Sequence, residues 1–308
     1  MSPLPPRYQH PGYAFLHRYG SLQTEADVFH YVEFLRDSAG LSNRLPTDLD
    51  SIYSYFGMPI PLRVPLNEQQ GILLDTYKGV ILIKEDDPIV RQRFTEGHEL
   101  MELLFDAQAD VAQKLKIPPW DESRKEKLCD AGAAELLMPR SQFSSHLNHL
   151  GVSLETARSL SALYQTSLLA TLIRMVELAS GQHALVVWHR SLKPSERKAA
   201  KRHRAITEPA NSEEPAKPEQ IKSEPAQPDY LPKLRIWWRV TSPDWQAGFL
   251  PRDKSIDDTS LIVQALMTGQ TQKGQEVLQF GWGTIDCRIE AIPVQIGDKP
   301  CVISLLHA

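Results

Sequence analysis

The chain has 308 residues, a length that suits two domains rather than one. Its formal net charge of −4 gives no overall attraction to nucleic acid or to an anionic membrane. Three cysteines without a C-x-x-C pair show no disulfide framework, which suits a reducing compartment. No apolar run approaches the roughly 20 residues of a membrane span, and the first residues lack an apolar signal core. We therefore expect a cytoplasmic protein without membrane association.

The N-terminal third is predicted to contain an irregular arm, one helix and a small hairpin. Residues 1–20 are rich in proline and tyrosine, which favours a loose arm. Apolar residues at helical spacing predict a helix over residues 22–40. Two short apolar runs, 72–74 and 80–83, flank a turn and predict a small antiparallel hairpin.

The most informative segment is RFTEGHELMELLF, residues 93–105, which has the apolar spacing of a helix. His98 and Glu102 are four residues apart, so they lie on one helical face and can reach a single metal ion. Glu99 is turned roughly 100° away, toward water beside the ion. In the H-E-x-x-H pattern of zinc peptidases, two histidines bind the metal and the glutamate is the general base. Here Glu102 replaces the second histidine, so His98 and Glu102 are the predicted ligands and Glu99 the predicted base.

A second segment, EKLCDAGAAELLMP at residues 126–139, offers a third ligand. Glu126 and Asp130 are again four residues apart on a predicted helix, which Pro139 ends. We expect Glu126 to bind the metal. We expect Asp130 to accept the free ring N–H of His98, which fixes the histidine tautomer.

Other interpretations of these residues stay open. Considered alone, residues 93–105 fit an ordinary helix with a half-buried His98 and a solvated Glu102. The presence of the second segment, residues 126–139, favours the metal site over this interpretation. His146 and His149 are three residues apart and offer a substitute ligand, although a polar helix surface is the favoured interpretation.

The ligand set bears on the metal and on activity. Zn²⁺ held by two histidines and a glutamate keeps one net positive charge, whereas one histidine and two glutamates make the site neutral. A neutral site acidifies its water less but keeps the base, so we expect a metallo-endopeptidase with slow turnover, and an inactive site is the alternative. The additional oxygen ligand shifts the preference from Zn²⁺ toward Mn²⁺, Fe²⁺ or Mg²⁺. The expected cofactor is Zn²⁺ or Mn²⁺.

Two helices and a linker are predicted next. Residues 152–180 have the length and spacing of a helix-turn-helix-like unit, with Ser153 and Ser167 as N-caps. Its exposed basic residues are few, Arg158 and Arg174, which favours a two-helix packing unit over a DNA reader and argues against direct nucleic-acid binding. Residues 191–229 are first basic and then rich in proline and glutamate, which predicts a flexible linker.

Residues 230–308 are predicted to form a small α+β domain. Alternating apolar residues predict four strands, at residues 234–240, 276–280, 285–294 and 301–306. Apolar residues at helical spacing predict one helix, at residues 257–267. The four tryptophans of this region either line a ligand pocket or, in the favoured interpretation, fill the core: Trp237, Trp238, Trp245 and Trp282.

The two central segments together resemble a known family. FTEGHELMELLF resembles the FTLAHELGHLLLH of the ImmA/IrrE metallo-endopeptidases, and EKLCDAGAAELLMP resembles their EREANRFAAELLMP. The likeness covers residues 25–180, with Glu102 in place of the second zinc histidine. It implies an α+β fold, with a mainly helical metallopeptidase domain over residues 1–190 that includes a small antiparallel sheet and the helix-turn-helix-like unit. Longer members resemble this chain in having a small C-terminal domain, here 230–308, that is GAF-like, a fold often used for sensing.

The resemblance also implies a function. Family members cleave a helix-turn-helix transcriptional repressor, which derepresses a stress or mobile-element regulon, and we expect such a repressor to be the partner. The second hypothesis is a catalytically impaired, protease-like binding module that regulates a transcription factor. The third and weakest is a DNA-binding regulator that uses residues 153–204. The oligomeric state has no signal in the sequence.

Overall fold

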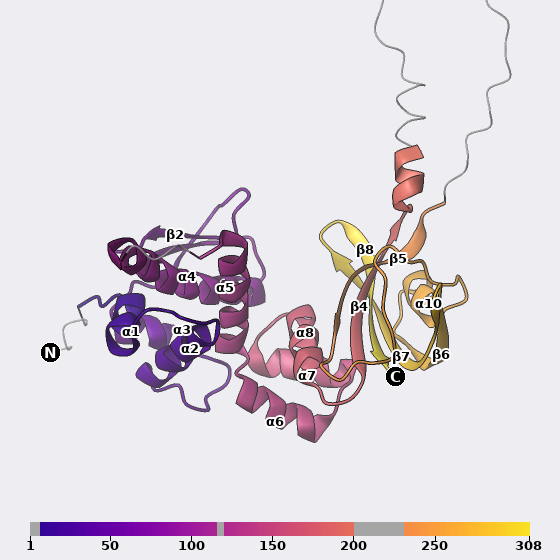
Figure 1. Ribbon diagram of the computed structural model, residues 1–308, viewed down its shortest axis with the longest axis horizontal. Helices are drawn as coiled ribbons and strands as arrows, with labels where there is room; N and C mark the ends of the chain where they lie inside the picture. The colour runs from indigo at the N-terminus through magenta and orange to yellow at the C-terminus, as the bar shows by residue number, and fades with distance from the viewer. Residues whose placement is uncertain (1–6, 116–119, 200–230) are drawn as a thin grey trace, which may run out of the picture. The chain divides into compact units, whose positions relative to one another are not determined.

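The computed structural model describes residues 7–115, 120–199 and 231–308 (Figure 1). The chain divides into two compact units at residues 179 and 180. Residues 200–229 of the predicted linker lie outside the described residues, while residues 194–199 are helical. In the described part of the chain, no helix is long and apolar enough to cross a membrane.

The N-terminal unit is mainly helical. Residues predicted to be a loose arm instead contain a helix, α1, which His10 caps by accepting a hydrogen bond from the Tyr13 backbone N–H. The elements of this unit, in chain order, are α1 (Pro11–Tyr19), α2 (Ala26–Ser38), α3 (Leu49–Phe56), β1 (Leu62–Val64), β2 (Gly71–Asp75), β3 (Val80–Lys84), α4 (Ile89–Leu115), α5 (Glu122–Leu137), α6 (Arg140–Leu150), α7 (Leu154–Tyr164) and α8 (Leu168–Leu178).

The core of this unit forms around α4. Leu100, Leu103 and Leu104 are fully buried, as their spacing on one side of the helix predicts. Helix α5 packs closely on α4, because a Cβ at Gly97 would lie 3.2 Å from the Cβ of Ala133. Small residues at this crossing therefore bring the two helices that carry the predicted site together.

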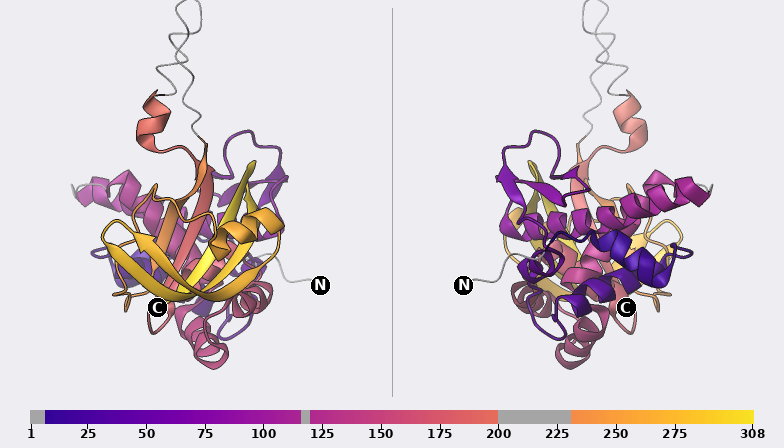
Figure 2. Two further views of the ribbon diagram at one scale, coloured as in Figure 1. Left: turned by 90° about the vertical axis from the view of Figure 1, so that its right-hand side faces the viewer. Right: turned by 90° about the vertical axis from the view of Figure 1, so that its left-hand side faces the viewer.

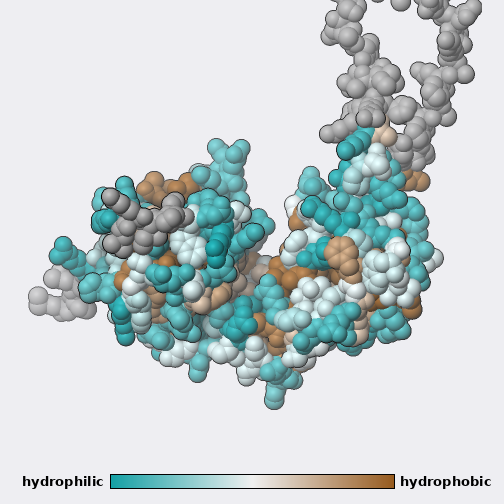
Figure 3. Space-filling model, in the orientation of Figure 1, coloured by the Kyte–Doolittle hydropathy of each residue, from teal (hydrophilic) through white to brown (hydrophobic). Residues whose placement is uncertain are grey.

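The three-stranded sheet has the order β1-β3-β2. Strands β2 and β3 form the predicted antiparallel hairpin, but β1 pairs with β3 in parallel, so the sheet is mixed rather than antiparallel. Strand β2 is an edge strand and contacts α4. Some apolar side chains here stay exposed, such as Leu74 and Tyr77, and hydrophobic colour forms only small patches on the mostly hydrophilic face of this unit in Figure 3.

The helix-turn-helix-like unit consists of α7 and α8. Ser153 and Ser167 are the N-caps, as predicted, and each accepts a hydrogen bond from a backbone N–H. The prediction that Arg174 is exposed is wrong. Its guanidinium is buried, forms an ion pair with Glu135 and donates to the Met138 carbonyl oxygen at 3.0 Å. Arg174, one of the two basic residues considered for DNA contact, therefore binds α8 to the end of α5.

The C-terminal unit is an open antiparallel sheet with one helix packed against it, and residues 194–199 form a further short helix. The strand order is β5-β4-β8-β7-β6, and α10 (Leu261–Thr268) lies against β6, β7 and β8 (Figure 2, left). The strands are β4 (His183–Ser191), β5 (Lys233–Thr241), β6 (Gln272–Phe280), β7 (Gly283–Ile296) and β8 (Lys299–His307). The predicted domain limits at 190 and 230 do not follow this division, because β4 pairs with β5 and β8 across the linker.

The tryptophans of this unit do not all fill its core. The fully buried one is Trp188 on β4, whose indole N–H donates to Ser304 Oγ at 2.7 Å. Trp238 and Trp282 keep 40% and 48% of their surface exposed, so the favoured core interpretation is wrong for these two. Trp282 stacks on Phe280 with 5.6 Å between ring centroids.

Candidate metal centre

Two crossing helices position the candidate site. Helix α4 carries His98, Glu99 and Glu102, and α5 carries Glu126 and Asp130. The structure brings the carboxylates to both nitrogens of the imidazole. His98 Nδ1 lies 3.0 Å from Asp130 Oδ1, while His98 Nε2 lies 3.7 Å from Glu126 Oε2 and 3.9 Å from Glu102 Oε1. The expected Asp130–His98 contact is thus present, whereas the ligand roles of the other residues stay a prediction.

Opposing effects determine the pKa of the His98 imidazole. Burial lowers the pKa of His98, but the hydrogen bond and charge of Asp130, together with the charges of Glu99 and Glu102, outweigh burial and raise it. With Asp130 accepting the Nδ1 proton, Nε2 is the nitrogen left to face the remaining carboxylates.

Glu99 differs from the other carboxylates of the site in being almost fully buried, with 7% of its surface exposed. Burial is the main cause that raises its pKa from 4.5 to about 7, and the charges of Glu102 and Glu126 act in the same direction. The backbone of β2 covers it, since a Cβ at Gly71 would lie 2.7 Å from Glu99 Oε1. A carboxyl group with a pKa near 7 is matched to taking and returning a proton at neutral pH.

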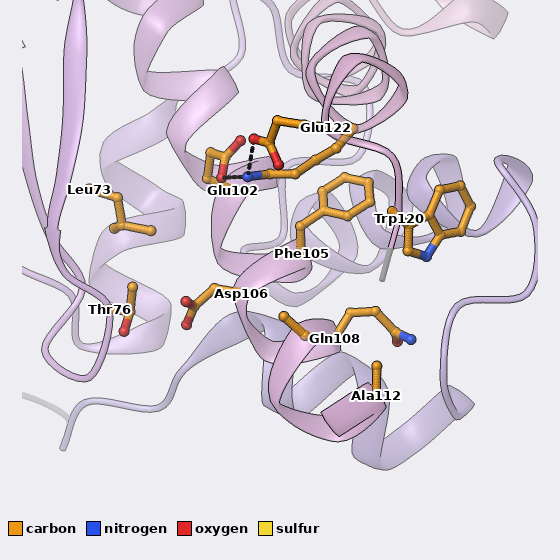
Figure 4. A pocket seen from close by; sticks show the side chains of 11 residues that line it. Leu73, Thr76, Glu102, Phe105, Asp106, Gln108, Ala112, Trp120 and Glu122 are labelled. Carbon is orange, nitrogen blue, oxygen red and sulfur yellow. Dashed lines mark hydrogen bonds and ion pairs between the residues drawn. The ribbon is translucent and has the colours of Figure 1, made fainter. Parts of the chain in front are cut away.

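Two residues that the sequence analysis did not place in the site contact Glu102. The Lys125 ammonium lies 2.8 Å from Glu102 Oε2 and 3.1 Å from Glu122 Oε1. Dashed lines mark these two ion pairs in Figure 4. The Cys129 thiol donates to Glu102 Oε1 at 3.4 Å. Burial and the nearby Glu102 carboxylate raise the pKa of this thiol well above its ordinary value. Lys125 and Cys129 are four residues apart on α5, and this spacing, which puts both on one helical face, was the available signal.

The alternative histidine ligand is engaged elsewhere. His146 Nδ1 lies 3.0 Å from the hydroxyl oxygen of Tyr164 and packs edge-on against its ring. Among the described residues, the compact group of metal-binding side chains is His98, Glu102 and Cys129. It includes neither His146 nor Glu126, the predicted third ligand.

The site opens into a groove between β2 and the two helices. A cavity of about 330 Å³ is lined by the imidazole, by the carboxylates of Glu99, Glu102 and Glu126, and by β2 residues from Gly71 to Leu73. A second cavity, of about 440 Å³, continues past His98 toward Phe94. A third, of about 360 Å³, continues past Glu102 and ends at aromatic side chains, Phe105 and Trp120 (Figure 4). The first cavity shares lining residues with each of the other two, so the three lie in succession across the site, and we refer to them together as the groove.

The donor atoms suit a divalent metal ion. Imidazole nitrogen, carboxylate oxygen and thiol sulfur are its usual ligands, with bonds of about 2.0 to 2.3 Å. Ligand atoms around such an ion lie roughly 3 to 4 Å apart, and the separations here are 3.4 Å for Cys129–Glu102, 3.7 Å for His98–Glu126 and 3.9 Å for His98–Glu102. The Lys125 ammonium now neutralises Glu102, so binding of a metal by Glu102 would exchange one cation for another.

Comparison with known proteins agrees with this geometry. Residues 57–176 match the IrrE N-terminal-like domain of the peptidase M78 family. The match includes β1 to β3, α4 and α5, and hence every candidate site residue, and it indicates a metallopeptidase-type domain or a regulator-associated one. A search of curated proteins found no match.

A solved structure of a Mycobacterium tuberculosis transcriptional regulator shares the fold, with a TM-score of 0.54. The superposition covers 99% of this chain and 81% of that chain, at 12% sequence identity. At this identity the likeness concerns the fold alone.

Proposed function

We propose that this protein is a metal-dependent endopeptidase, with Zn²⁺ or Mn²⁺ held by His98, Glu102 and Glu126. The observation that supports the proposal is the approach of Glu102 and Glu126 to His98 Nε2, at 3.9 and 3.7 Å, beside a cavity that the buried Glu99 also lines. When bound, the metal ion would supply Lewis acidity to the scissile carbonyl and to a water molecule. The Glu99 carboxylate accepts the proton of that water and returns it to the amide nitrogen that leaves.

The other residues of the site orient the reactants. Asp130 orients the His98 ring by accepting its Nδ1 proton, so that Nε2 is the nitrogen that would bind the metal. Strand β2 lies at the edge of its sheet and lines the groove, so it can pair with an extended peptide laid across the site. The substrate class that fits is a flexible segment of a protein.

We propose a helix-turn-helix transcriptional repressor as that substrate, so that cleavage derepresses a stress or mobile-element regulon. Two points support this proposal. Residues 57–176 match an IrrE-type domain, and the resemblance to the ImmA/IrrE family implies cleavage of such a repressor. The burial of Arg174 supports a packing role for α7 and α8 rather than DNA binding. For the C-terminal unit we propose a GAF-like sensor, supported by its open antiparallel sheet with α10 packed against it.

A catalytically impaired binding module is the second candidate. The ion pair between Lys125 and Glu102 favours it, because an ammonium group already neutralises the carboxylate that stands in place of the second histidine. In this case the groove binds the repressor and leaves it intact.

Cleavage of a co-expressed helix-turn-helix repressor separates the two candidates. We expect slow cleavage by the wild type with Zn²⁺ or Mn²⁺, and none by Glu99→Gln, which keeps the shape of the side chain but cannot accept a proton. Glu102→His should raise the rate, because it restores the net positive charge of the site. Wild-type protein that binds the repressor but leaves it whole with Zn²⁺, Mn²⁺ and Fe²⁺ would contradict turnover and support the binding module.

A further inference from the structure

Cys129 lies in the site but has no role in the function proposed above. Its side chain is fully buried on α5, and its thiol points at Glu102 Oε1, 3.4 Å away. Among the described residues, ligand atoms of His98, Glu102 and Cys129 lie within 4.8 Å of one another. A buried thiol beside an imidazole and a carboxylate is a donor set of the kind that holds zinc in proteins.

Cys129 and Glu126 approach the imidazole from different environments. Glu126 keeps 55% of its side chain exposed and lines the cavity together with Glu99, whereas Cys129 is buried and does not line it. An ion bound by His98, Glu102 and Cys129 would therefore have Cys129 on its buried side. The side toward the cavity would stay open for Glu126 or water to exchange.

We propose that the Cys129 thiolate is a resident ligand of the metal centre, beside His98 and Glu102, and that it makes the centre selective for zinc. The inference rests on the proposed metal site, but not on turnover. It assigns the stable third ligand to sulfur and leaves Glu126 as an exchangeable carboxylate on the cavity side.

The chemistry of binding balances within the site. The S–H bond of Cys129 breaks, its proton passes to solvent, and a sulfur–metal bond forms. Glu102 exchanges the Lys125 ammonium for the metal, and Lys125 keeps its second partner, Glu122. One thiolate and one carboxylate neutralise a divalent ion. Sulfur is a soft ligand that favours Zn²⁺ over Mn²⁺, which reverses the preference expected from two oxygen ligands.

Cobalt substitution of the full-length protein tests the proposal. A thiolate bound to Co²⁺ gives a sulfur-to-cobalt charge-transfer absorption in the near ultraviolet, which oxygen and nitrogen ligands do not give. We expect this absorption in the wild type and its loss in Cys129→Ser. The matched control is Cys301→Ser, which changes another buried cysteine, in the C-terminal unit, and should keep the absorption. The zinc affinity of Cys129→Ser should fall by roughly 100-fold, with Mn²⁺ affinity changed by less than about threefold.

The outcomes distinguish the role of Cys129 from the existence of the metal site. Cobalt that binds the wild type without the charge-transfer absorption would overturn the role of Cys129 and leave the His98, Glu102 and Glu126 site standing. Failure of the wild type to bind cobalt or zinc would overturn both. If Cys129→Ser does not fold, X-ray absorption of the zinc-loaded wild type supplies the answer without a variant. It should show one sulfur neighbour at about 2.3 Å, and only nitrogen and oxygen neighbours would refute the proposal.

Discussion

Replacing Glu99 by glutamine should change how the stability of the metal-free protein depends on pH. Burial raises the pKa of Glu99 from 4.5 to about 7 in the folded state, so the folded protein holds this proton where the unfolded chain releases it. The stabilisation is complete below about pH 4.5 and is lost as pH rises through 7. Relative to Glu99→Gln, which cannot ionise, the wild type should therefore lose about 3 kcal/mol between these limits.

Urea unfolding of both proteins in the presence of a chelator, followed by helical circular dichroism, measures this difference. The signal reports mainly on the N-terminal unit, because the long helices α2, α4 and α5 belong to it. Glu33→Gln, at an exposed position on α2, is the matched control and should follow the wild type at every pH. A Glu99→Gln advantage that stays constant between about pH 5 and about pH 8 would refute the reasoning. Burial would then not account for the base role that we propose for this carboxyl.

Three further predictions concern the neighbours of the site. Lys125→Met should raise zinc affinity by about tenfold in calorimetric titration, because it removes the cation that competes for Glu102; unchanged or weaker affinity would show that the ion pair does not oppose metal binding. Asp130→Asn should lower zinc affinity by roughly 10- to 100-fold without unfolding the protein, since His98 loses the acceptor that orients it, and equal affinity in the same titration would remove that role. Arg174→Met should lower the free energy of unfolding by roughly 3 kcal/mol in urea, because it leaves the half-buried Glu135 carboxylate without its charged partner; a loss below about 1 kcal/mol would place that pair in solvent.

The sequence predicts best those parts of the site that depend on one helix. His98 and Glu102 lie on one face of α4 because residues four apart in a helix always do. The small residues of α5 also indicate the close crossing that brings Asp130 within 3.0 Å of the imidazole.

What the sequence does not predict depends on contacts between elements. The helical repeat allows Lys125 and Cys129 to face the site, but only the rotation of α5 against α4 directs both at Glu102. Strand β4 was missed as a member of the C-terminal sheet, because it precedes the linker and its partner β5 begins only at Lys233. Polarity suggested that Arg174 is exposed, whereas an acidic partner on another helix lets it be buried.

The metal content of the purified protein tests most directly whether His98 and Glu102 bind a metal ion. Native mass spectrometry of the full-length wild type after dialysis against Zn²⁺ should show one bound ion per chain. Glu99→Gln should bind the ion as the wild type does, because the base is not a ligand, while Glu102→Ala and His98→Ala should lose it. A wild type that carries no metal, or a Glu102→Ala variant that keeps it, would contradict a metal centre built on these residues.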